Sequence, residues 1–191
     1  LKGTVYEGGL RVPGIIEWPD MITRGVRTEM PACVMDIFPT IVDIVGLPEE
    51  AQLQPADGIS LRKGIESGRF GRRPKPIPFR FQGKGAWLDN NLKLIVEDVE
   101  KREYALYDLK ADPDESENLF DKQTKIAKRM QREFEKWNEG AVASDEGCDY
   151  REGQVTDPDP RRVFWTEMPE YEPYFEDWKK RPEFEGRLKD F

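Results

Sequence analysis

The sequence contains no histidine and only two cysteines, and these two absences limit its chemistry more than any feature that it has. Without histidine, the chain supplies no imidazole as a general base, general acid or metal ligand. Nothing in the sequence requires Cys33 and Cys148 to pair, so we predict two unlinked thiols. The GxSxG, P-loop, HExxH and CxxC patterns are absent as well. The residues therefore indicate no complete catalytic site.

Long apolar runs and an excess of positive charge are also missing. No stretch of 18 apolar residues occurs, and no charged-then-apolar leader starts the chain, so we predict no membrane span and see no signal peptide. Thirty Lys and Arg residues against 38 Asp and Glu give a net charge of −8, which disfavours a nucleic-acid partner. Only 37% of the residues are hydrophobic, so either the core is modest or part of the chain lies on another surface.

The first 76 residues begin with the glycine-rich stretch KGTVYEGGLRVPG, which contains Lys2. RVPGIIEWP, at residues 11–19, predicts a short buried strand between two prolines. MDIFPTIVDIVGLP, at residues 35–48, predicts a helix with Asp36 as its N-cap and Gly46 and Pro48 at its end. Because this helix is apolar nearly all round, we expect a larger body to bury it.

Residues 49–76 read as a loop with a basic patch. The patch contains Arg69, Arg72, Arg73 and Lys75. A solvated loop and an anion-attracting rim both remain open as interpretations.

From residue 77 the pattern changes to short strands followed by a helix. Alternating or apolar runs at 77–82, 85–89, 92–99 and 103–109 predict an antiparallel meander, with a turn at residues 89–91. A stripe with helical spacing predicts a helix over 121–139, ended by Gly140 and packed on the meander; the stripe consists of Ile126, Met130, Phe134 and Trp137. Residues 141–191 are rich in proline, aromatic and charged residues, and we expect an extended arm wrapped over a surface, with a short helix within 170–180. Disorder is the alternative, but disordered tails are usually poor in aromatic residues.

Two local features suggest ligand chemistry weakly. The ammonium of Lys2 beside a glycine-rich turn is a candidate clamp for a tetrahedral anion, although a solvent-facing lysine remains an alternative. The acidic run DPDESE at 112–117 suggests calcium, but its spacing does not match a calcium loop, so a solvated loop is favoured.

Four motifs in order resemble the second half of the formylglycine-dependent sulfatases. KGTVYEGGLRVPG is similar to the family signature G-K-x-x-x-Y-E-G-G-x-R-x-P, and VMDIFPT to its V-x-D-hydrophobic-x-P-T helix. ADGISL resembles its D-G-x-S-L turn. NLKLIV followed by YALYDLKADPDESENL resembles the W-K-L and L-Y-D-L-x-x-D-P-x-E-x-x-N-L ending. The resemblance covers residues 2–119, and the helix 121–139 completes the family's small C-terminal subdomain.

The resemblance implies an α/β fold, here an α+β fragment. It implies the edge of an alkaline-phosphatase-like sandwich in residues 1–76 and a small subdomain in 77–140, with a four-stranded antiparallel sheet and one helix. Residues 141–191 form the arm. The family uses calcium and a formylglycine made from cysteine in a C-x-[PA]-x-R motif. That motif is absent at Cys33 and Cys148, so we expect the nucleophile and the metal site in a missing N-terminal part.

The resemblance assigns one catalytic residue in this chain, Lys2, which would contact the sulfate group. Arg80 and Trp87 are further candidates for substrate contact, whereas Glu7, Gly8, Gly9 and Arg11 are expected to be structural. The expected activity is hydrolysis of sulfate esters on a small molecule or glycan by the full-length, periplasmic or secreted enzyme, with the fragment inactive alone. A phosphonate or phosphodiester hydrolase and a non-catalytic interaction module remain alternatives.

Overall fold

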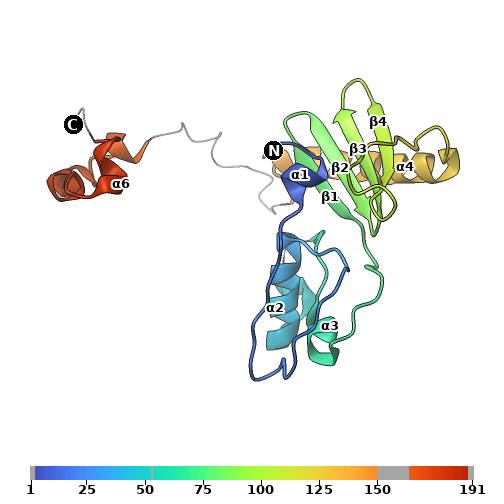
Figure 1. The fold of residues 1–191 in the computed structure, drawn as a ribbon, viewed down its shortest axis with the longest axis horizontal. Helices are drawn as coiled ribbons and strands as arrows, with labels where there is room; N and C mark the ends of the chain where they lie inside the picture. The colour runs from blue at the N-terminus through green and yellow to red at the C-terminus, as the bar shows by residue number, and fades with distance from the viewer. Residues whose placement is uncertain (1–2, 53, 150–163, 189–191) are drawn as a thin grey trace. The chain divides into compact units, whose positions relative to one another are not determined.

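The computed structural model describes residues 3–52, 54–149 and 164–188 (Figure 1). The chain divides into two compact units, Leu1–Gln154 and Val155–Phe191, and each is described by itself. The first unit combines helices with a β-sheet, and the elements described in the second unit are short helices.

A four-stranded antiparallel meander forms the centre of the first unit (Figure 1). Its strands are β1 (Ile77–Phe81), β2 (Lys84–Asp89), β3 (Leu92–Asp98) and β4 (Glu103–Asp108). Neighbours in sequence are neighbours in the sheet, so β2 and β3 are the interior strands. The turn predicted at 89–91 is confirmed, with Asn90 in the left-handed region that asparagine tolerates (φ 57°). The predicted sheet is therefore confirmed almost residue for residue.

One face of the sheet packs on α4 (Thr124–Asp145) (Figure 1). Met130 and Phe134 of the predicted stripe are buried there, with Ile126 and Trp137 packed against them. The partners from the sheet are Trp87, Leu94, Val96 and Leu106. The prediction that Gly140 ends this helix is wrong, because the backbone remains helical to Asp145. A glycine in a polar helical stretch weakens a helix by about 1 kcal/mol but does not by itself stop it.

The other face of the sheet is covered by residues 3–10, called here the opening segment. Val5 is fully buried against Ala86, Ile95 and Ala105 of the three neighbouring strands, and Tyr6 packs beside it. The segment ends in the short helix α1 (Glu7–Leu10). The first unit therefore has three layers here: the opening segment, the sheet and α4 (Figure 1).

Residues 11–19 do not form the predicted buried strand. They adopt no regular structure, and the side chains of Val12 and Ile15 are 78% and 92% exposed. A strand needs a neighbouring strand for its backbone hydrogen bonds, and the described part of the chain places none beside this segment.

The predicted helix at 35–48 forms as the 3₁₀ turn η1 (Val34–Asp36) and α2 (Ile37–Val45), ended by Gly46 in the left-handed conformation. It is followed by η2 (Glu49–Ala51) and α3 (Arg62–Ser67). The rest of the described chain covers only one side of α2, where Pro39, Thr40 and Val42 are buried. Ile37, Phe38 and Ile41 are 50–57% exposed, which leaves an apolar face uncovered.

The second unit is built from short helical turns around stacked aromatic rings. Its elements are η3 (Trp165–Glu167), η4 (Glu172–Tyr174), α5 (Phe175–Trp178) and α6 (Pro182–Glu185). Trp178 stacks on Tyr174 and Phe184, with ring centroids 5.7 and 5.5 Å away. The short helix expected within residues 170–180 is present as η4 and α5. The extended arm expected around it is not, because the described residues 164–188 coil back so that their aromatic rings pack on one another.

Among the described residues, no helix combines the length and apolar character needed to cross a bilayer. The 22-residue helix α4 is long enough but carries many charged side chains.

Candidate functional site

The opening segment is attached to the sheet by a buried group of three charges, called here the docking triad: Glu7, Lys93 and Glu115. The Nζ atom of Lys93 lies 2.8 Å from Glu7 Oε1 and 2.8 Å from Glu115 Oε1. The Lys93 side chain is fully buried, and the Glu115 side chain is 4% exposed. Glu115 also accepts a hydrogen bond from the backbone N–H of Glu7 at 2.7 Å. The triad therefore joins three distant parts of the sequence.

The local sequence explains why these charges meet. Side chains alternate along β3, so Lys93 shares a face with Ile95, the face that the opening segment covers. Glu115 follows β4 in a loop where Asp112 accepts hydrogen bonds from the backbone of Ser116 and Glu117. These bonds, chiefly that from Glu117, lower the pKa of Asp112. The acidic run is thus an ordered turn that presents Glu115 to Lys93.

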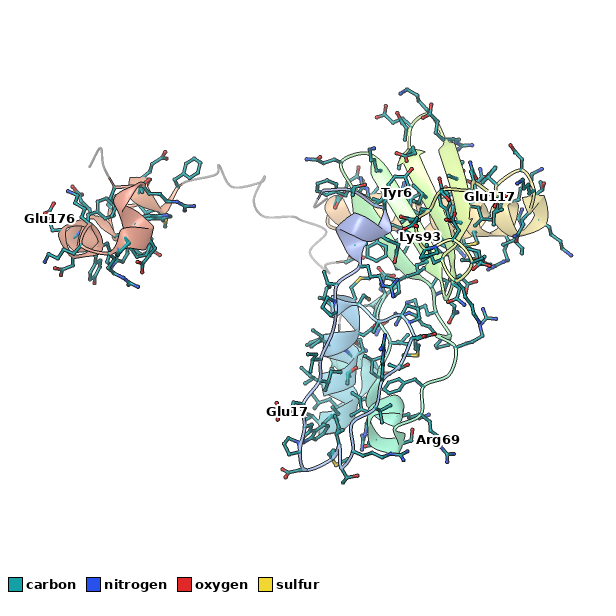
Figure 2. All side chains as sticks on the ribbon, viewed as in Figure 1. Tyr6, Glu17, Arg69, Lys93, Glu117 and Glu176 are labelled. Carbon is teal, nitrogen blue, oxygen red and sulfur yellow. The ribbon has the colours of Figure 1, made fainter. Side chains whose placement is uncertain are left out.

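A second polar contact lies beside the triad. The hydroxyl of Tyr6 donates a hydrogen bond to the carboxylate of Glu97, which also lies 3.1 Å from the ammonium of Lys84. Burial, and then the bond to Glu97, raise the pKa of Tyr6 well above its ordinary value. The bond from Tyr6 is in turn the main cause of the lowered pKa of Glu97. Adjacent residues of the opening segment are therefore bound to two positions of β3 (Figure 2).

The expected structural partner of Glu7 was the backbone or Arg11, but the closest described cation is Lys93. Arg11 lies 3.9 Å from Glu7 and is largely exposed, whereas Lys93 is buried against the same carboxylate at 2.8 Å. Lys2, the predicted catalytic residue, lies outside the described residues. Its chain neighbour Gly3 is described and has φ 89°, a conformation that favours glycine.

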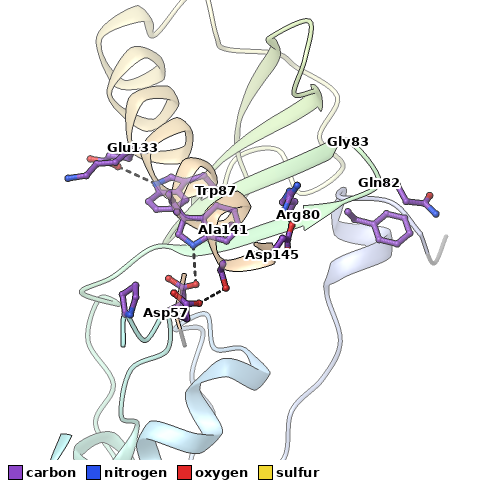
Figure 3. Close-up of a pocket in the computed structure, with 15 residues that line it drawn as sticks. Asp57, Arg80, Gln82, Gly83, Trp87, Glu133, Ala141 and Asp145 are labelled. Atoms are coloured by element: carbon purple, nitrogen blue, oxygen red, sulfur yellow. Dashed lines mark hydrogen bonds and ion pairs between the residues drawn. The ribbon is translucent and has the colours of Figure 1, made fainter. Parts of the chain in front are cut away.

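The structure brings the other two predicted site residues, Arg80 and Trp87, to one open pocket (Figure 3). The pocket has a volume of about 960 Å³ and lies beside the C-terminal part of α4. Arg80 is exposed and forms an ion pair with Asp145. Trp87 is largely buried, and its indole N–H donates to Glu133 Oε2 at 3.2 Å.

A second tryptophan, Trp137, contributes to this pocket and was not predicted as a site residue. The indole N–H of Trp137 donates to Asp57 Oδ2 at 3.0 Å, which links α4 to the DGIS turn (Figure 3). Trp137 was interpreted as core, and it does pack against Phe134 and Trp87. The pocket therefore combines indole rings with carboxylates, and the polar groups of Arg80 and Trp87 bind Asp145 and Glu133.

Of the predicted basic patch, Arg73 is neither in solvent nor on a rim. Its guanidinium binds both carboxylate oxygens of Asp36 at 2.8 Å, and neither side chain has any exposed area. Arg72, by contrast, is 81% exposed, with Asp89 3.6 Å away. The patch is thus divided between a buried ion pair and exposed side chains.

Asp36 occupies the N-cap position of α2, as predicted, but its side chain makes no capping bond to this helix, because its carboxylate binds three other groups. It accepts hydrogen bonds from the backbone N–H groups of Cys33 and Ile59, both at 2.8 Å, as well as from Arg73. Burial alone would raise the pKa of Asp36, but these hydrogen bonds outweigh it and lower the pKa. Gly58 permits the close approach, since a Cβ there would lie 2.0 Å from Met35 O.

The described residues provide no calcium site, and neither cysteine of the sequence lies in the formylglycine motif. Within residues 3–52, 54–149 and 164–188, no group of three or more Asp, Glu or Cys side chains is arranged to hold a metal ion. Cys33 and Cys148 are both free thiols, in agreement with the prediction that they do not pair. Burial raises the pKa of Cys33, which makes it a poor thiolate nucleophile.

Comparison with curated proteins finds sulfatases. The chain is 42% identical to human steryl-sulfatase over 65 residues, which are 33% of this chain and 11% of that protein. It is 31% identical to an uncharacterized sulfatase of Schizosaccharomyces pombe over 127 residues, 62% of this chain and 23% of that protein. Over 73 residues it is 37% identical to N-acetylgalactosamine-6-sulfatase of Sus scrofa, 38% of this chain and 14% of that protein. No protein-family profile matches.

The resemblance inferred from the four motifs is therefore confirmed: the chain is related in sequence to the sulfatases. It spans about a tenth to a quarter of the length of these relatives.

Solved sulfatase structures superpose on this chain with low TM-scores. The crystal structure of Ps i-CgsB with k-i-k-neocarrahexaose matches with a TM-score of 0.47 and 20% identity, over 84% of this chain and 31% of that one. A putative sulfatase, yidJ, from Bacteroides fragilis gives a TM-score of 0.42 and 21% identity, over 55% of this chain and 24% of that one. Both scores lie below 0.5, so they establish no shared fold.

Sequence reasoning missed Lys93, Glu115 and Arg73 as partners. Lys93 and Glu115 are the lysine of NLKL and a glutamate of DPDESE, so the motifs contained both residues without indicating that they meet. A lysine inside an otherwise apolar strand was the available signal, because an unpaired buried ammonium is costly. Arg73 lay in a run of exposed cations, and nothing in its spacing distinguishes it.

Proposed function

We propose that this chain is the C-terminal part of an arylsulfatase-like enzyme that hydrolyses sulfate esters. The observation that carries the proposal is the sequence similarity to several sulfatases. The docking triad supports it, because it joins three of the motif segments that suggested the family. Residues 1–76 then belong to the edge of the catalytic core, 77–140 to the small subdomain, and 141–191 to an appendage.

In the proposed enzyme, Lys2 contacts the sulfate group. Negative charge grows on the leaving oxygen as the S–O bond breaks, and an ammonium close to the sulfate oxygens offsets that charge in the transition state. A lysine supplies this as a compact point charge. We assign the nucleophile and the rest of the chemistry to the missing N-terminal part, because the cysteine motif of the family is absent from this sequence.

That N-terminal part would carry the calcium ion and the formylglycine, for which the described residues here provide no site. The uncovered apolar face of α2 supports a larger partner. Ile37, Phe38 and Ile41 lie along one helix, each at least half exposed, and such a patch marks an interface. Because the nucleophile and the metal site lie in the N-terminal part, we expect the fragment alone to be inactive. The resemblance to the family supports a full-length enzyme that acts in the periplasm or outside the cell.

The pocket containing Arg80 and Trp87 is the place in this chain where a sulfated small molecule or glycan would make further contacts. Carboxylates beside indole rings suit the hydroxyls and apolar faces of a sugar. Two of the relatives, steryl-sulfatase and N-acetylgalactosamine-6-sulfatase, are named for different substrates, so the chemistry on the alcohol side of the ester is left open.

The test is a comparison of ester classes with the full-length protein. We expect turnover of an aryl sulfate such as 4-nitrophenyl sulfate, and much weaker turnover of bis-(4-nitrophenyl) phosphate and of a phenylphosphonate monoester. The 191-residue chain should turn over none of them. A preference for the phosphorus esters would favour the related hydrolase. Binding of a sulfated glycan by the full-length protein without turnover of any ester would favour the interaction module.

A further inference from the structure

We propose that Glu7 and Lys93 of the docking triad are positioning residues, which set the place of Lys2 by fixing the opening segment on the sheet. This inference rests on the proposed function, because it assigns the triad to the same reaction. The triad touches no substrate in this account. Its effect passes through the backbone from Glu7 to Lys2, five positions earlier in the chain.

The contacts on the sheet fix both the location and the direction of the segment. Tyr6 and Glu7 are adjacent, yet they bind Glu97 and Lys93, which are four residues apart on β3 and share one face. Such positions are separated by about 13 Å along a strand. Two anchor points this far apart prevent rotation of the segment on the sheet as well as translation. Val5 between Lys2 and these anchors is fully buried, so it anchors the segment as well.

The charges of the docking triad contribute more to the precise position of the opening segment than to the stability of the fold. An ammonium with no exposed area pays a large desolvation cost, and apolar side chains of similar volume would stabilise the same contact as well or better. An apolar contact tolerates sliding, whereas two N–O distances of 2.8 Å are satisfied in one arrangement. Glu115 leaves Lys93 with a partner when the Glu7 side chain is removed, so this removal takes away one anchor of the segment without leaving a buried unpaired ammonium. The bond from Tyr6, the burial of Val5 and the bond from the backbone N–H of residue 7 to Glu115 remain, so we expect a small displacement of the segment and not its release.

Misplacement of a catalytic group by about 1 Å can cost on the order of 100-fold in rate. The decisive experiment is therefore a double-mutant cycle in the full-length enzyme with Glu7→Ala, Lys2→Ala and the double variant, assayed on an aryl sulfate. We expect Glu7→Ala to lower kcat by about 10- to 100-fold with little change in KM. In the Lys2→Ala background the same change should cost less than about 2-fold, because the group that it positions is already absent.

Controls separate this effect from general loss of structure. Glu117→Ala removes an exposed glutamate two residues from Glu115, whose pair with Lys122 lies outside the triad, and should leave kcat unchanged. Glu7→Gln keeps the length and an oxygen acceptor, so it should recover a large part of the loss. If Glu7→Ala does not fold, Lys93→Arg, which keeps the charge but moves it, takes its place in the cycle with the same expected non-additivity.

The outcomes distinguish this inference from the proposed function. Multiplicative losses from Glu7→Ala and Lys2→Ala, or unchanged kcat in Glu7→Ala, would overturn the positioning role while leaving the sulfatase assignment intact. If Lys2→Ala itself leaves turnover of the aryl sulfate unchanged, the role proposed for Lys2 fails, and the positioning inference fails with it.

Discussion

At the scale of single residues, the charged side chains with no exposed area explain most of how this chain is tied together. Asp36 with Arg73 joins the start of α2 to the segment before β1, and Lys93 with its two glutamates joins the opening segment to β3. Each group connects residues that lie between 22 and 86 positions apart in the sequence. They therefore add directional contacts between elements that are distant in the sequence, and for the opening segment these contacts lie beside an apolar cluster around Val5.

Removing one partner of the Asp36–Arg73 pair should be strongly destabilising. We expect Arg73→Met to lower the free energy of unfolding near neutral pH by about 3–5 kcal/mol, because it leaves a buried carboxylate without its counter-ion. Urea denaturation followed by far-UV circular dichroism measures this loss. Arg62→Ala, which removes a partly exposed arginine paired with Glu66 and Asp43, is the matched control and should cost much less, because water screens exposed ion pairs. Equal losses would contradict the account.

The same pair gives a pH dependence of known sign. The pKa of Asp36 is lowered in the folded protein, so its contribution to stability is present above the unfolded pKa and is lost as pH falls through the folded pKa. In Arg73→Met the buried carboxylate gains from protonation instead. The difference in stability between the two proteins should therefore shrink below about pH 4. A difference that stays constant into acid would mean that Asp36 is not ionised beside Arg73.

At the scale of elements, the sequence is most informative where the pattern is regular and the partners are near in sequence. The four strands and the stripe of α4 were predicted because alternation and helical spacing are local properties, and each strand pairs with the next. The strand predicted at 11–19 failed because its apolar residues have no neighbouring strand to pair with. The end of α4 was misplaced because a single glycine was given more weight than the helical residues after it.

Gly140 offers a test of where α4 ends. It lies inside the helix, and a Cβ there would meet nothing within 4 Å. We expect Gly140→Ala to stabilise the chain by about 0.5–1 kcal/mol, because alanine has the higher helix propensity. Thermal denaturation by circular dichroism measures the change, with Ala143→Gly in the next turn as the reverse control. Destabilisation by Gly140→Ala would show that the helix stops there.

At the scale of the whole molecule, the sequence identified the family of the candidate site but not its assembly. The motifs indicated Lys2 and the tight turn after it, because those residues are contiguous. That Glu7, Lys93 and Glu115 meet on one face of the sheet was not predictable, since it depends on how the opening segment folds back across β3. The uncovered face of α2 was anticipated by the excess of apolar residues around that helix.

The uncovered face of α2 gives a prediction that compares two contexts. Ile41→Gln should change the stability of the 191-residue chain by less than about 0.5 kcal/mol, because the side chain is half exposed there. In the full-length protein, where we expect this face to be covered, the same change should cost about 1.5–3 kcal/mol. Chemical denaturation of both proteins measures the two values. Equal small effects would mean that the face is free in the complete protein.

The central claim is that Lys2 stabilises the sulfate group during hydrolysis by the full-length enzyme. The most direct test is the kcat of the Lys2→Ala variant on 4-nitrophenyl sulfate, with an unaltered melting temperature as the check on folding. The account predicts a loss of about 100- to 1,000-fold, the range seen when one preorganised electrostatic group is removed from an active site. A correctly folded Lys2→Ala enzyme that turns over at the unaltered rate would contradict it.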